Sequence, residues 1–159
     1  MDDRLIAVLK QASQADGIPV VFITRQGKPL WLVMPQVKGT DGWHPMSDQA
    51  RWLNVHGTKH NYVSKPVLPH WEVPRAWLNL LVRRLLERYN ACYIVQGLRV
   101  KEVCAPACWN AKGFVCECSC MGANHSRGHS EGWYTVSESC AVRWRAHELH
   151  YKLLRQVAR

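Results

Sequence analysis

A run of soft metal donors lies in the C-terminal half of the sequence. Five of the seven cysteines and two of the eight histidines fall between residues 104 and 129. Thiolates and imidazoles are the usual ligands of structural zinc, and a closed site takes four of them from short loops. The spacing therefore predicts a zinc site. The donors are Cys104, Cys108, Cys116, Cys118, Cys120, His125 and His129, with Gly113, Gly122 and Gly128 among them.

Geometry leaves the ligand set open within six candidates. On a strand, residues two apart share a face at about 6.6 Å, within reach of one metal ion, whereas Cys116 and Cys120 would stand about 13 Å apart. The segment must therefore bend, or one cysteine is a spare or serves a second metal. An iron-sulfur cluster, which needs three or four thiolates, is the alternative cofactor. We favour zinc because a following histidine suits mixed nitrogen and sulfur ligation. The candidate ligands are Cys104, Cys108, Cys116, Cys118, Cys120 and His125.

A disulfide framework fits the same cysteines less well. The cysteine count is odd, and residues such as Cys116 and Cys118 are too closely spaced for a regular framework. The first residues, Met-Asp-Asp-Arg-Leu, lack a basic region followed by an apolar core, so we expect no signal peptide. No apolar run approaches the length of a membrane span, so we expect no membrane partner. These features predict a soluble, cytoplasmic protein.

The cysteine run also resembles a known type of cluster. Its C-x3-C, C-x-C-x-C and Gly-x-x-His elements, from Cys104 to His125, cover about a fifth of the chain. This combination is similar to clusters in small uncharacterised proteins of bacteriophages and mobile elements. The resemblance implies an accessory protein of phage or plasmid type, and it implies no activity and no catalytic residue.

The charge balance favours a polyanionic partner. The chain has 21 basic and 12 acidic residues, a net charge of +9 and a pI near 9.4. Neutralising phosphates releases counterions and supplies much of nonspecific nucleic-acid affinity, so the excess predicts binding to DNA, RNA or a nucleoprotein complex. We expect the contacts on the basic faces of two long helices. The candidates are Arg83, Arg84, Arg88, Arg143, Lys152 and Arg155.

The first part of the chain predicts the core of a small single α+β domain. Residues 2–15 have the apolar spacing of an amphipathic helix. Residues 20–24 and 29–33 are β-rich runs around Gly27 and predict a hairpin. Residues 35–72 are rich in proline and glycine and predict loops, with one short helix near 47–53. Pro74 opens a strong helical pattern that continues to about Tyr89.

The second part of the chain predicts a hairpin, the zinc loop and a terminal helix. Residues 92–95 and 98–103 predict the second hairpin, turning at Gln96-Gly97. A short strand at 133–136 and a helix from Ser137 or Ser139 nearly to Arg159 complete the fold, which divides into an α+β core (1–103), a metal-binding loop (104–132) and a returning segment (133–159). Cys92 and Cys140 are expected to be buried structural thiols. The helical stripe is Cys140, Trp144, His147, Tyr151 and Leu154.

The motifs favour a binding protein over an enzyme. Zinc sites rich in cysteine are mostly closed and structural, and the sequence has no deaminase signature, phosphate loop, nucleophile elbow or His-Glu-x-x-His helix. We therefore expect a zinc-binding accessory protein that binds nucleic acid. Two alternatives stay open: a protein-binding inhibitor of a host defence or replication complex, and a metal-dependent nuclease. The nuclease could draw on His44, His56, His60 and His70.

Overall fold

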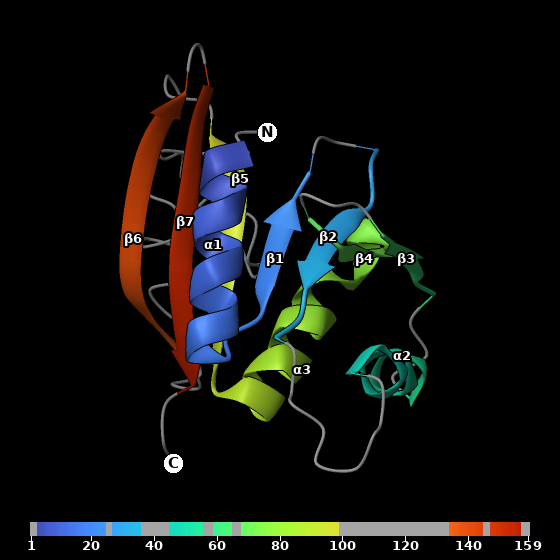
Figure 1. The fold of residues 1–159 in the computed structure, drawn as a ribbon. Coiled ribbons are helices and arrows are strands. Elements are labelled where there is room, and N and C mark those ends of the chain that lie inside the picture. Colours follow the sequence, from blue (N-terminus) through green and yellow to red (C-terminus); the bar gives the residue numbers. More distant parts are fainter. Residues whose placement is uncertain are drawn as a thin grey trace.

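The helices and strands are arranged around one mixed seven-stranded sheet (Figure 1). The computed structural model describes residues 3–24, 27–35, 45–55, 59–64, 68–98, 134–144 and 147–156. The strand order is β3-β4-β2-β1-β5-β7-β6. The α+β class expected from the sequence is confirmed at this level, whereas residues 104–132, the predicted metal-binding loop, lie outside the described residues.

Strand β1 (Val20–Ile23) lies at the centre of the sheet because its side chains are apolar on both faces. Val20, Val21 and Phe22 are almost fully buried, a continuous pattern typical of a strand covered on both sides. β1 pairs antiparallel with β2 (Leu30–Val33) and parallel with β5 (Ala91–Leu98). β1 and β2 occupy the positions expected for the first hairpin, and Gly27 between them has a φ of 79°.

Two clusters of buried side chains lie on opposite faces of the sheet. Val21 and Ile23 of β1 join a cluster with the apolar side of α3 (Leu78–Tyr89) and with Leu53 of α2 (Pro45–Val55). Val20 and Phe22 point the other way and join Tyr93 and Leu153. In Figure 1, α1 (Asp3–Asp16) lies in front of β5 and β7, while α3 packs on the other face. Helices therefore cover both faces.

Helix α3 forms where the sequence predicts it. A short 3-10 turn, η1 (Arg75–Trp77), follows Pro74 and leads into the helix, whose apolar residues are buried. Each such leucine contributes about 1.5–3 kcal/mol on burial. The helix ends at Asn90, which has a φ of 59° and donates its backbone N–H to the carbonyl of Leu86 at 2.8 Å. A left-handed asparagine is a common helix stop. The buried residues are Leu78, Leu81, Val82, Leu85 and Leu86.

The loop-rich interpretation of residues 35–72 is only partly right. The expected helix is present as α2, but the segment also contributes two edge strands, β3 (Asn61–Val63) and β4 (His70–Val73). β4 pairs antiparallel with β2 and with β3. Both strands are very short and Pro66, Pro69 and Pro74 flank β4 closely, so no period is long enough to be recognised in the sequence.

The predicted turn at Gln96-Gly97 is wrong. β5 continues through both residues, and they pair with His150 and Leu149 of β7 (His147–Gln156). A tight turn there would favour a glycine with positive φ, but the described glycines with positive φ are Gly17 and Gly27. The long pairing with β7 therefore keeps this stretch extended.

The predicted terminal helix is also wrong. Residues 137–144 belong to β6 (Tyr134–Trp144) and residues 147–156 form β7; the two strands pair antiparallel with a register shift between Val136 and Glu138. Leu153 and Leu154 are both buried but belong to opposite core clusters, as expected for neighbouring residues on a strand covered on both faces. Pairing with β5 along one edge and β6 along the other overrides the helical spacing.

Candidate functional site

The predicted metal ligands fall in the connection between β5 and β6. Both strands pair antiparallel with β7, so they run parallel to each other. Residues 99–133 join them and contain all six candidate donors: Cys104, Cys108, Cys116, Cys118, Cys120 and His125. These lie outside the described residues, and within the described ranges no three histidine, cysteine or acidic side chains form a group that could hold a metal ion. Zinc and the alternative iron-sulfur cluster therefore stay predictions.

Cys92 occupies a structural position, as its place in the sequence suggests. Its side chain is 0% exposed in the core beneath α3, and the thiol donates to the carbonyl of Tyr93 at 3.5 Å. Burial raises the pKa of the Cys92 thiol far above its ordinary value of 9.0. Because thiolates are the reactive and metal-binding form, Cys92 is a poor ligand and a poor nucleophile. For Cys140 only the backbone, in β6, is described.

The two histidines with described side chains contact different tryptophans. His60 meets Trp71 edge-on with ring centroids 5.1 Å apart, and His70 lies against Trp31 at 4.5 Å. Trp71 belongs to the core cluster under α3 and Trp31 to the opposite cluster, so the two imidazoles do not share a site. His44 and His56, the other histidines considered for a nuclease, lie outside the described residues.

His70 is buried and its ring is oriented by one hydrogen bond. The residue is 2% exposed, and Nδ1 donates to the carbonyl oxygen of Leu68 at 2.8 Å. Nε2 is buried and finds no hydrogen-bond partner among the described residues. The bond at Nδ1 fixes the orientation of the ring, which packs against Trp31.

The six predicted nucleic-acid contacts are divided among three elements. Arg83, Arg84 and Arg88 lie on α3, as expected, but Arg143, Lys152 and Arg155 lie on strands, so the second basic helix is wrong. Lys152 is only 5% exposed, whereas Arg155 is exposed three residues later on the opposite face of β7. The six residues therefore do not form one surface. The three arginines of α3 are the predicted contacts that lie together on one helix.

On α3 the arginines occupy the side away from the core. Arg83 and Arg84 are exposed, and Arg84 pairs with Glu87 at 2.8 Å. Arg88 lies one turn after Arg84 and pairs with Asp48 of α2 at 2.7 Å. The Arg88 side chain is 27% exposed, so this ion pair is at the rim of the core and still in contact with water. Arg88 thereby joins the surface of α3 to that of α2.

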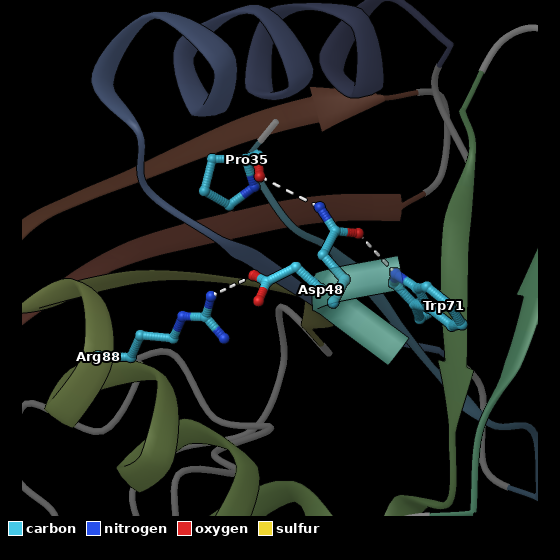
Figure 2. Close-up of polar contacts among 5 residues, drawn as sticks. Pro35, Asp48, Trp71 and Arg88 are labelled. Carbon is cyan, nitrogen blue, oxygen red and sulfur yellow. Dashed lines mark hydrogen bonds and ion pairs between the residues drawn. The ribbon is translucent and has the colours of Figure 1, made fainter. Parts of the chain in front are cut away.

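Helix α2 is held to the sheet by the residue next to Asp48. Figure 2 shows the side-chain amide between Pro35 and Trp71, and this amide belongs to Gln49. Gln49 Nε2 donates to the Pro35 carbonyl at 3.2 Å, and Trp71 Nε1 donates to Gln49 Oε1 at 2.8 Å. All three residues are buried, so the amide satisfies two polar groups that have little access to water. Consecutive residues of α2 thus contact the sheet and α3.

Aromatic rings surround the Arg88 guanidinium. Its Cζ atom lies 5.4 Å from the ring centroid of Trp52 and 5.3 Å from that of Tyr89, within the range of a cation–π contact. Burial raises the pKa of Tyr89, the positive charge of Arg88 opposes that rise, and Asp48 adds to it. Tyr89 therefore stays neutral at physiological pH. Trp52 and Tyr89 are half-buried and pack against the core.

Sequence reasoning named Arg84 and Arg88 but missed the residues around them, Asp48, Trp52 and Tyr89, although one signal was present. Asp48 and Trp52 are four apart on α2 and so lie on the same side of the helix, but nothing in the sequence links them to Arg88 forty positions later. We name Asp48, Arg51, Trp52, Arg84, Arg88 and Tyr89 the α2–α3 surface.

Comparisons with protein-family models, with curated proteins and with solved structures find no match. The resemblance of the cysteine run to phage proteins is therefore neither supported nor opposed. Within the described part of the chain, no helix is long and apolar enough to cross a membrane.

Proposed function

We propose that the protein binds nucleic acid through the exposed side of α3 and the adjoining part of α2. The observation that carries the proposal is the side of α3 away from the core, where Arg83 and Arg84 are exposed and Arg88 follows one turn later. Guanidinium groups suit phosphate because their donors are planar and permanently charged. The net charge of +9 gives the whole molecule the same preference.

Helix α2 extends this basic side. Arg51 is exposed and lies three residues after Asp48, on the same side of α2, while Asp48 itself pairs with Arg88. The two helices together contribute four arginines and two carboxylates, Asp48 and Glu87, so cationic side chains outnumber anionic ones on them. Phosphates are the common polyanion that such a surface attracts.

The cysteine-rich segment is proposed to bind one structural zinc ion, with ligands among Cys104, Cys108, Cys116, Cys118, Cys120 and His125. Its support is the type and spacing of the donors in the sequence. In this proposal the zinc stabilises the chain between β5 and β6 and takes no part in chemistry, so the protein is a binding protein of accessory type.

The test is binding of labelled DNA and RNA, single- and double-stranded, by fluorescence anisotropy over a range of salt concentrations. We expect affinity to fall steeply with salt, and the double variant Arg83→Glu/Arg84→Glu to weaken binding and flatten the salt dependence. A control with the same change in charge is Lys10→Glu/Lys28→Glu, on α1 and in the β1–β2 turn, which should have a smaller effect. No affinity for any of these probes would reject the proposal and favour a protein partner.

A further inference from the structure

Arg88 of the α2–α3 surface lies beside two aromatic rings that are not fully covered. Trp52 and Tyr89 pack against the core with one side and are half-buried, and the Arg88 guanidinium lies over both rings. A guanidinium held against an indole is a flat, cationic surface. Nucleic-acid bases stack on aromatic rings and on guanidinium planes alike.

The arrangement is fixed before any ligand arrives. Asp48 holds Arg88 at 2.7 Å, and Trp52 lies one turn after Asp48 on the same side of α2. Gln49, next to Asp48, anchors α2 to the sheet through its two buried hydrogen bonds. A binding surface whose side chains are already ordered loses less conformational entropy when it binds.

We propose that the nucleic acid bound by this surface is single-stranded, with unpaired bases stacking at Trp52 and Arg88 and with phosphates contacting Arg84 and Arg51. This inference rests on the proposed function. In a duplex the bases already stack on one another, so side-chain stacking is available chiefly to unpaired bases. The carboxylates of Asp48 and Glu87 also lie among the arginines, and they disfavour the dense phosphates of a duplex.

The test compares two probes of equal length and sequence, a labelled single strand of about 12 nucleotides, within the usual site size, and its duplex. We expect tighter binding of the single strand. Trp52→Leu should lower that affinity about fivefold or more, the lower end for loss of one base–aromatic stack, without changing the salt dependence. Arg88→Lys keeps the charge but loses the planar group, so it should weaken binding and likewise leave the salt dependence unchanged.

The matched control is Trp31→Leu. Trp31 is also half-buried, but it packs on the opposite face of the sheet against His70, so its replacement should leave the affinity within about twofold. Thermal unfolding of each variant shows whether it is folded. If Trp52→Leu does not fold, Trp52→Phe retains a packed ring with a smaller stacking area and should show a smaller loss in the same direction.

Two results would separate the inference from the proposed function. Equal or tighter binding of the duplex, or an unchanged affinity in Trp52→Leu while Arg83→Glu/Arg84→Glu still weakens binding, would overturn the stacking site and leave nucleic-acid binding standing. Absence of binding by the unaltered protein to either probe would overturn both.

Discussion

Gln49 gives the most direct test of how α2 is attached to the sheet. Its amide accepts from Trp71 Nε1 at 2.8 Å and donates to the Pro35 carbonyl at 3.2 Å, and all three residues are buried. Gln49→Met has nearly the same length and volume, so it removes both hydrogen bonds while keeping the packing. The indole N–H and the carbonyl then lose their partner.

A buried polar group left without a partner costs about 1–3 kcal/mol. With two such groups and some gain from the more apolar methionine, we expect a loss of about 2–4 kcal/mol in the free energy of unfolding. That is a large part of the ~5–15 kcal/mol that stabilises a typical domain. Urea unfolding measures the change, and an unchanged m-value shows that the unfolding transition is the same.

The control for this experiment is Asn54→Met, an exposed position on the same helix, which should change the stability by at most about 0.5 kcal/mol. Trp71→Phe removes the indole N–H that donates to Gln49. In a double-mutant cycle, Gln49→Met should therefore lower the free energy of unfolding less in the Trp71→Phe protein than in the unaltered protein, by a difference of about 1 kcal/mol or more. A loss below about 1 kcal/mol for Gln49→Met alone would refute the view that this amide anchors α2.

Three further predictions concern the metal, the buried thiol and the ion pair. We expect about one zinc ion per chain by elemental analysis. Cys104→Ser or Cys108→Ser should abolish zinc binding, Cys92→Ala should retain it, and chelation should lower the melting temperature. A purified protein that contains no metal and whose melting temperature does not change with a chelator would contradict this prediction. Because burial raises the pKa of Cys92 above 9.0, the unfolded chain loses this proton first as pH rises, and stability should fall above about pH 9 by up to about 1.4 kcal/mol per pH unit. Urea unfolding at pH 8 and pH 10 should show that the free energy of unfolding falls less with pH in Cys92→Ala than in the unaltered protein. The same fall with pH in both proteins would contradict this prediction. Asp48→Asn should cost at most about 1 kcal/mol in thermal unfolding, because the ion pair with Arg88 is partly exposed; a loss of about 2 kcal/mol or more would contradict this.

The parts of the fold that could be predicted are those with local signals. Helix α3 has a proline before it, an apolar stripe along one side and an asparagine at its end, all within one continuous segment. Strands β1 and β2 are short apolar runs around Gly27, whose positive φ suits the turn. In such segments, local preference and tertiary packing favour the same structure, so the sequence alone is sufficient.

The errors occur where pairing between distant segments determines the structure. Gln96-Gly97 is a reasonable turn by composition, but eight consecutive residues of β5 pair with residues of β7 that lie fifty or more positions away. The spacing of Cys140, Trp144, His147, Tyr151 and Leu154 fits a helix. In β7 the neighbours Leu153 and Leu154 are buried on opposite faces, so this stretch gives no alternation to oppose that interpretation. The α2–α3 surface was not predicted for the same reason, because its contacts join distant segments: Gln49 and Trp71 are 22 positions apart, and Asp48 and Arg88 are 40 positions apart.

The topology indicates what the proposed metal site between β5 and β6 would stabilise. Leu98 at the end of β5 pairs with Glu148, whereas Tyr134 at the start of β6 pairs with Gln156, so the connection must return along the length of β7. That distance is about 27 Å at the rise of a strand, and parallel strands generally need such a crossover. Closing a connection of this length costs conformational entropy, which grows with the number of residues. A zinc ion bound by residues 104–125 would divide the connection into shorter segments and contribute its binding energy to folding. The proposed zinc would therefore stabilise the edge pair of β6 and β7, and because Leu154 of β7 packs in the core cluster with the apolar residues of α3, its loss would also weaken the support beneath α3.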